Sequence, residues 1–144
     1  MIEIRDALPN DADQLSPLLE ALGYPTEAPT LRLRLQDLTL RDPTGRVLVA
    51  VRGTDILGFA TLHGTPVLHR PTPVGRITGL AVRPEARGAG AGRMLVEAAE
   101  AHCTALGWAR LEVTSGPIHA AAYGFYRHLG YRDHGVRFAK PLPA

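Results

Sequence analysis

The chain has 144 residues, 45% hydrophobic and 21% charged, which is the size and composition of one globular domain with a core of its own. Its net charge of +2 is small, its arginines are spread along the chain and only 6% of its residues are aromatic, so a nucleic-acid-binding module is disfavoured. No apolar run reaches the ~18 residues of a membrane span, and the N-terminus lacks a signal-peptide pattern, so we expect a cytoplasmic protein without a membrane partner. Because Cys103 is the single cysteine, we expect neither a disulfide nor a cysteine-based metal site.

The N-terminal half shows strand, helix and hairpin patterns in turn. Apolar and polar residues alternate at the start of the chain, which predicts a strand. Leucines then recur at spacings of three and four in two segments, and each spacing predicts a helix with one buried face. The segment Gly53-Thr54-Asp55 tolerates the positive φ of a tight turn and predicts a hairpin. The expected elements are a strand over 1–5, helices over 11–23 and 30–40, and antiparallel strands over 47–51 and 57–62.

The C-terminal half begins with a proline-rich loop. We expect this loop over Gly64–Pro73, because its prolines do not fit a central strand or a helix. Apolar spacing then predicts a long helix that ends at Gly107. The expected elements are a strand over 75–82, a helix over 89–106, a strand over 108–114, a helix over 118–129 and one or two closing strands within 131–141. This order predicts a single mixed α/β (α+β) domain over residues 1–144.

The most informative segment runs from Leu80 to Arg93, where an apolar strand passes through a proline turn into a glycine run that opens a helix. The first N–H groups of a helix lack partners within it and carry the positive end of its dipole, so such a junction binds anions. A P-loop needs Lys and Ser/Thr after its last glycine, but Arg93-Met94 follows Gly92. A Rossmann fingerprint needs a sixth-position glycine, where counting from Gly88 gives Arg93. Both nucleotide motifs are therefore excluded.

Three segments carry recognisable patterns: the glycine run from Arg87 to Gly92, the strand end from Leu80 to Pro84 and the segment from Tyr123 to Tyr131. Together they resemble motifs of the GNAT superfamily of N-acetyltransferases. The run Arg87-Gly88-Ala89-Gly90-Ala91-Gly92 resembles its coenzyme A motif, Gln/Arg-x-x-Gly-x-Gly/Ala. The preceding Leu80-Ala81-Val82-Arg83-Pro84 resembles the hydrophobic-x-Val-x-Pro end of a strand. The segment from Tyr123 to Tyr131 resembles the Phe-Tyr-x-x-x-Gly-Phe/Tyr end of a helix. The N-terminal half, where the acceptor site is expected, carries no such motif.

The resemblance implies a fold and an activity. The GNAT fold has a central, twisted, mostly antiparallel sheet with flanking helices, and its fourth and fifth strands splay apart to admit the cofactor. Gly79 supports a β-bulge at that place. The implied activity is transfer of an acetyl group from acetyl-CoA to a primary amine of a small molecule or a protein, with no metal and no covalent enzyme intermediate. A homodimer is compatible with the resemblance, and nothing in the sequence decides it.

The resemblance also implies roles for individual residues. The backbone N–H of Val82 is the implied donor to the acetyl carbonyl, and Tyr126 is the implied general acid for the coenzyme A thiolate. The alternative is that Tyr126 packs in the core and exposes its hydroxyl to water. The implied cofactor-binding residues are Leu80, Ala81, Val82, Arg87, Gly88, Ala89, Gly90, Ala91, Gly92, Arg93, His119 and Tyr126.

Two positions depart from the family pattern. Thr78 stands where many members carry Glu; a threonine is no general base, but its hydroxyl can position a water that carries the amine proton away. His119 stands where Asn is frequent, and it either contacts the pantetheine amide or faces solvent. The missing Glu motivates the alternative that the chain is a coenzyme A-binding or sensing domain with reduced turnover.

Other titratable residues have a structural and a functional interpretation. Glu112 either faces the cleft as a base or pairs with Arg110 or another arginine, and the pairing is favoured. For His63 and His69, near the expected acceptor entrance, an ordinary loop position is favoured. Cys103 fits a small buried hydrophobe better than a nucleophile, because no nearby residue in the sequence lowers its pKa.

Overall fold

The computed structural model describes residues 1–114, 120–135 and 137–143. Met1–Thr114 and Ser115–Ala144 form two compact units. A single domain over the whole chain stays a prediction. None of the helices in the described residues has the length and apolar character that crossing a membrane requires.

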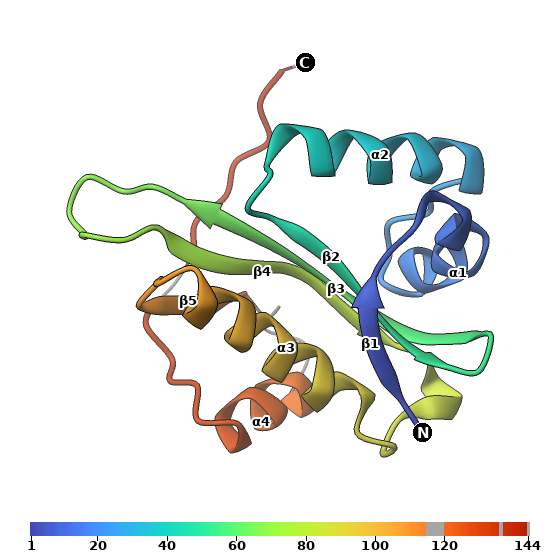
Figure 1. Cartoon of the computed structure of the whole chain (residues 1–144). Coiled ribbons are helices and arrows are strands. Elements are labelled where there is room, and N and C mark those ends of the chain that lie inside the picture. The colour runs from blue at the N-terminus through green and yellow to red at the C-terminus, as the bar shows by residue number, and fades with distance from the viewer. Residues whose placement is uncertain (115–119, 136, 144) are drawn as a thin grey trace. The chain divides into compact units, whose positions relative to one another are not determined.

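The first unit is built on a five-stranded mixed sheet with the order β1-β2-β3-β4-β5 (Figure 1). The first four strands are antiparallel to their neighbours, whereas β5 runs parallel to β4. The mostly antiparallel sheet that the family resemblance implies is therefore confirmed. The strands are β1 (Glu3–Asp6), β2 (Arg46–Arg52), β3 (Asp55–Thr65), β4 (Val74–Val82) and β5 (Arg110–Val113).

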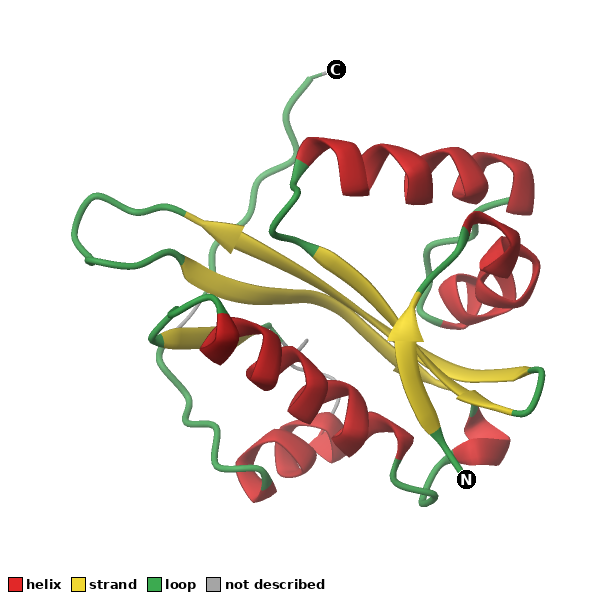
Figure 2. Ribbon diagram, viewed as in Figure 1, coloured by secondary structure: helices red, strands yellow, loops and turns green. Residues whose placement is uncertain are grey.

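Helices lie on both faces of this sheet. In the first unit, α1 and α2 cover one face and α3 covers the opposite face (Figure 2). Two short 3₁₀ turns precede α1 and α3. The helical segments are η1 (Pro9–Asp11), α1 (Ala12–Ala21), α2 (Ala28–Arg41), η2 (Pro84–Ala86) and α3 (Ala91–Ala105) in the first unit, and α4 (Ala120–His128) in the second.

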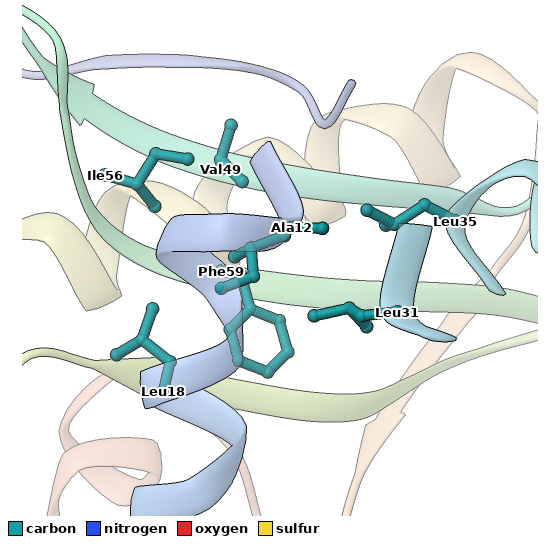
Figure 3. Packing of buried hydrophobic residues seen from close by; sticks show 8 residues of the cluster. Ala12, Leu18, Leu31, Leu35, Val49, Ile56 and Phe59 are labelled. Atoms are coloured by element: carbon teal, nitrogen blue, oxygen red, sulfur yellow. The ribbon is translucent and has the colours of Figure 1, made fainter. Parts of the chain in front are cut away.

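The leucine spacings seen in the sequence produce the core under α1 and α2. Leu15 and Leu18 of α1 and Leu31 and Leu35 of α2 lie on buried faces, and the ring of Phe59 packs among them (Figure 3). Burying one such leucine contributes roughly 1.5–3 kcal/mol. The sheet residues of this cluster are Val49, Ile56 and Phe59.

The α3 face has a core of its own. Leu95, Val96 and Ala99 of α3 are fully buried. Side chains alternate along a strand, so Leu48, which is next to Val49, and Leu62 point to this face. Both faces of the central strands are thus apolar, which explains why β2 and β3 read as nearly continuous apolar runs.

Several predicted boundaries need correction. The closing strands expected within 131–141 were wrong: residues 131–135 and 137–143 contain no strand, and all of them except Tyr131 are exposed. A strand needs a neighbouring strand for its hydrogen bonds, and the alternation of apolar and polar residues does not show whether that neighbour exists.

Two boundaries are shifted. The loop expected from Gly64 begins after Thr65, because Gly64 and Thr65 still pair with β4. The helix expected from Ala89 begins at Ala91, and Ile118 and His119 lie outside the described residues.

Gly64 provides space for the indole of Trp108. A Cβ at Gly64 would overlap the Cη2 atom of Trp108. We expect Gly64→Ala to lower the free energy of unfolding by about 1–3 kcal/mol, because the ring has to move out of a packed site. Urea unfolding followed by circular dichroism measures this change.

Gly124→Ala is the matched control. A Cβ at Gly124 meets nothing within 4 Å, and this residue lies inside α4. Its replacement should leave stability unchanged or raise it by up to about 1 kcal/mol. Equal stability losses in the two variants would contradict the packing role of Gly64.

Candidate functional site

The glycine-rich turn joins the end of β4 to the start of α3. Gly88 and Gly90 have φ values of +85° and +91°, which side chains with a Cβ rarely adopt. An added Cβ at either position would meet nothing within 4 Å. These glycines are therefore required by the backbone conformation, and they leave the backbone open to a ligand. Arg87, Gly88, Ala89 and Gly90 form the turn, and Ala91, Gly92 and Arg93 are the first residues of α3.

The turn is electropositive. Helix α3 is 15 residues long, and its N-cap residue Gly90 offers no side chain to its first amides. These amides carry the positive end of the helix dipole. The side chains of Arg87 and Arg93 are exposed at the same turn. Arg93 pairs with Glu97 at 3.4 Å in an exposed, weak contact, whereas Arg87 has no ion pair within the described residues. The turn can therefore bind an anion.

Strand β4 carries a bulge at Thr78. Gly79 pairs with Thr61, but the next pair is Ile77 with Leu62, so Thr78 is an extra residue without a partner in register. The bulge predicted near Gly79 is therefore confirmed; the unpaired residue is its neighbour Thr78. It coincides with the end of the β4–β5 ladder, whose last pair is Ile77 with Val113. Val113 is also the last residue of β5.

In the part of the chain that the structure describes, the second half of β4 has an open edge. Within the described residues no strand pairs with Leu80, Ala81 or Val82 on the β5 side. The N–H of Arg83 bonds to the carbonyl of Leu57 on β3, at 2.7 Å. Because amide direction alternates along a strand, the N–H of Ala81 also faces β3, whereas those of Leu80 and Val82 face the open edge. Two backbone donors are therefore available there.

Two hydroxyl groups meet at the bulge. The Oγ1 atoms of Thr61 and Thr78 are 2.8 Å apart, and either group can donate. Thr78 is exposed, so its hydroxyl is within reach of water. The sequence identified Thr78 but missed Thr61, because only the register of β3 against β4 brings the two residues together.

A second polar group lies beside the bulge on β4 and β5. Glu112 accepts hydrogen bonds from Arg110 Nε at 2.7 Å and from Arg76 Nη2 at 3.0 Å. The Arg110 hydrogen bond, opposed in part by burial and then reinforced by Arg76, lowers the pKa of Glu112. A carboxylate with a lowered pKa is a weak base, so the predicted pairing of Glu112 is confirmed. Arg76 was missed by the sequence analysis.

Tyr126 lies on α4, in the second unit. Burial raises the pKa of its hydroxyl to about 12. Its ring contacts those of Phe125 and Tyr131 edge-on, with centroids 5.2 and 6.1 Å away. The N–H of Tyr131 bonds to the carbonyl of Tyr126, and Gly130 has a φ of +95°, which is a glycine-terminated helix end. The glycine of the Tyr123–Tyr131 motif is thus explained by the way the helix ends.

The remaining candidate residues are His63, His69 and Cys103, and none of them belongs to the glycine-rich turn or to β4. His63 Nδ1 is 3.5 Å from Asp42 Oδ2, and His63 lines a cavity of about 300 Å³ at the start of β2 that includes no residue of β4 or of the glycine-rich turn. His69 is exposed in the loop after β3. Burial raises the pKa of the Cys103 thiol, which keeps it unreactive. Among the described residues no three His, Cys, Asp or Glu side chains gather as a metal site.

Comparisons with known proteins find relatives in sequence and in fold. The model of the acetyltransferase (GNAT) family matches residues 12–131. The aminoalkylphosphonate N-acetyltransferase of Salmonella typhimurium is 29% identical over 141 residues, which are 97% of this chain and 91% of that protein. The IAA acetyltransferase of Azospirillum brasilense is 33% identical over 132 residues, or 92% and 81%. A solved acetyltransferase structure from Trypanosoma brucei has the same fold, with a TM-score of 0.83, 24% identity and coverage of 99% and 100%.

The Glu112 pairs predict a pH-dependent stability. The folded pKa of Glu112 lies below its ordinary value of 4.5, so the pairs stabilise the fold above that pH and stop doing so as the pH falls through the folded pKa. We expect Glu112→Gln to lower the free energy of unfolding by under about 1 kcal/mol at pH 7, because the pairs are partly exposed. The loss should shrink as the pH falls below 4.5 and through the folded pKa of Glu112.

Unfolding in urea at a series of pH values measures this dependence. The control is Glu3→Gln, which removes an exposed carboxylate of β1 that forms no ion pair within the described residues. A Glu112→Gln effect of the same size at pH 7 and pH 3 would show that the charge of Glu112 is not what stabilises the fold.

Proposed function

Because this chain belongs to the GNAT family of acetyltransferases, we propose that it transfers the acetyl group of acetyl-CoA to the primary amine of a small molecule. The observation that carries this proposal is the open edge of β4, which leads directly into the glycine-rich turn. The two relatives reported above are named as acetyltransferases, one of them an N-acetyltransferase of aminoalkylphosphonates. This supports a small amine as acceptor, and a protein amino group is the alternative.

The glycine-rich turn fits the pyrophosphate of coenzyme A. Positive-φ glycines leave the backbone at Gly88 and Gly90 open, and the first amides of α3 have no capping side chain. Backbone amides at a helix N-terminus bind phosphate oxygens, and Arg87 adds a positive charge beside them. Arg87 through Arg93 therefore form the proposed pyrophosphate site. His119, the proposed contact of the pantetheine amide, lies outside the described residues.

The open edge of β4 fits the pantetheine arm. An extended ligand with amide groups can add to an exposed strand as another strand would. In this arrangement Leu80, Ala81 and Val82 run beside the arm, and the N–H groups of Leu80 and Val82 are the available donors. The Val82 N–H then donates to the carbonyl oxygen on which negative charge develops during attack.

Two protons have to move in this reaction. The amine loses one, and the proposed route is a water held by the paired hydroxyls of Thr78 and Thr61. The departing thiolate gains the other from the Tyr126 hydroxyl, whose pKa of about 12 keeps it protonated at neutral pH. The Tyr126 phenolate then recovers a proton from water. No side-chain nucleophile is required, because the amine attacks the thioester carbonyl directly.

The acetyl transfer itself is tested by thiol release from acetyl-CoA with a panel of primary amines. We expect release above the amine-free rate with at least one small amine and a weaker response with peptide amines. Binding of acetyl-CoA without turnover on any amine would instead favour a coenzyme A-binding domain. A peptide preference would overturn the small-molecule assignment.

Tyr126→Phe tests the proposed acid. We expect kcat to fall by roughly 10²-fold or more, because the variant cannot donate a proton to the thiolate. The Kd for acetyl-CoA, measured by calorimetry, should change by less than about twofold, because the ring remains. An unchanged kcat would reassign Tyr126 to packing around α4.

Arg87→Ala is the complementary variant for this test. Loss of one exposed charge–phosphate contact should raise the Kd for acetyl-CoA by roughly 10-fold and leave kcat at saturation nearly unchanged. The opposite pattern, a lowered kcat with an unchanged Kd, would remove Arg87 from the pyrophosphate site.

A further inference from the structure

The face of the sheet that α1 and α2 cover has an apolar half and a polar half. Val49, Ile56 and Phe59 lie in the buried cluster under these helices. Further along β3 the next side chain is polar: the hydroxyl of Thr61 forms a hydrogen bond with the hydroxyl of Thr78 on β4. Side chains two residues apart share a face, so Thr61 continues the face of Phe59. Thr78 is therefore on this face as well.

Arg76 lies on the same face. Ile77, between Arg76 and Thr78, is 2% exposed and pairs with Leu62 in the core under α3. Arg76 therefore points to the other side of the sheet, as does Glu112, its hydrogen-bonded partner in register on β5. Arg110 joins this group through its own bond to Glu112. Two guanidinium groups thus flank one carboxylate on β4 and β5, next to the bulge.

This group carries a net positive charge. Two arginines against one glutamate leave one positive charge, and the lowered pKa of Glu112 keeps that carboxylate ionised at neutral pH. Each arginine uses one nitrogen for Glu112, and within the described residues no other side chain accepts from either guanidinium. A guanidinium has five N–H donors, so most of them remain for a ligand. Arg76 is about half exposed, with 48% of its side chain accessible.

We propose that Arg76 and Arg110, oriented by Glu112, bind an anionic group of the acceptor, so that the substrate is a short amine with a phosphonate, phosphate or carboxylate at its other end. This inference rests on the proposed acetyl transfer. The bidentate geometry of guanidinium groups suits tetrahedral and planar oxyanions. Glu112 acts as a positioning residue, because it holds both guanidiniums and does not itself meet the acceptor.

The spacing along β4 sets the length of this acceptor. Arg76 and Thr78 are two residues apart, or roughly 7 Å at the rise of a strand. The amine is bound near Thr78 in the proposed mechanism, and its anionic end is bound by the arginines. A chain of two to four carbons between the amine and the anionic group spans that distance.

Kinetics with matched acceptors test the subsite. The pair is 3-aminopropylphosphonate and 3-amino-1-propanol, which have the same spacer and differ in charge. Wild type should show a kcat/KM at least 10-fold higher for the phosphonate. Arg76→Gln should raise the KM for the phosphonate by roughly 10- to 100-fold and leave the KM for the neutral amine within about twofold. Arg76→Lys, which keeps the charge, should give an intermediate KM.

The control is Arg46→Gln. Arg46 of β2 is also ion-paired and partly exposed, but its partner is Asp6 of β1, at the opposite edge of the sheet. This variant should leave both KM values unchanged. Equal changes of KM for the charged and neutral acceptors in Arg76→Gln, or no preference in wild type, would overturn the subsite.

Binding of methylphosphonate separates this inference from the proposed function. Methylphosphonate has no amine and needs no turnover, so calorimetry detects the subsite even in an inactive protein. We expect binding to wild type that weakens at least 10-fold in Arg76→Gln and persists in Arg46→Gln. Turnover of neutral amines without methylphosphonate binding would leave the acetyl transfer standing and refute the subsite. Methylphosphonate binding without turnover of any amine would refute acetyl transfer alone.

Discussion

The end of the β4–β5 ladder at Ile77 is the constraint on which the candidate site depends. Up to this residue the two strands are paired; beyond it Thr78 is an unpaired bulge residue, and no strand among the described residues pairs with the β5 side of β4. The alternation of backbone amides then decides that Leu80 and Val82, rather than Ala81, direct their N–H groups to that edge. A ladder that continued to Val82 would use the same donors within the sheet and leave no place for an extended ligand.

The glycine-rich turn depends on short-range physics. Its positive-φ glycines and the uncapped amides of α3 follow from residues adjacent in the chain, and any fold that continued this strand into this helix would have the same anion-binding corner. This explains why the turn, together with the strand end before it and the segment from Tyr123 to Tyr131, indicated the family, which the comparison over residues 12–131 then confirmed. The turn gives no information about the acceptor, because in the proposed arrangement it contacts only the cofactor.

The acceptor side depends on how α1 and α2 cover the sheet. They bury the apolar half of one face around Phe59, and the same face continues into hydroxyl and guanidinium groups along β3, β4 and β5. Glu112, which from the sequence was either a base or an ion-pair partner, is held between two arginines, and its lowered pKa suits a positioning role. In the proposed mechanism, specificity and proton transfer therefore belong to different groups: the arginines and the threonine hydroxyls.

The sequence by itself determined the features that depend on near neighbours: the leucine-lined helices, the hairpin at Gly53 and the glycine-rich turn. It failed for the closing strands expected within 131–141, because a strand exists only where another strand supplies its hydrogen bonds. The meeting of Thr61 with Thr78, and of Arg76 with Glu112, was decided by tertiary structure alone. Each of these pairs joins residues far apart in the chain, and strand register, a long-range property, sets which side chains become neighbours.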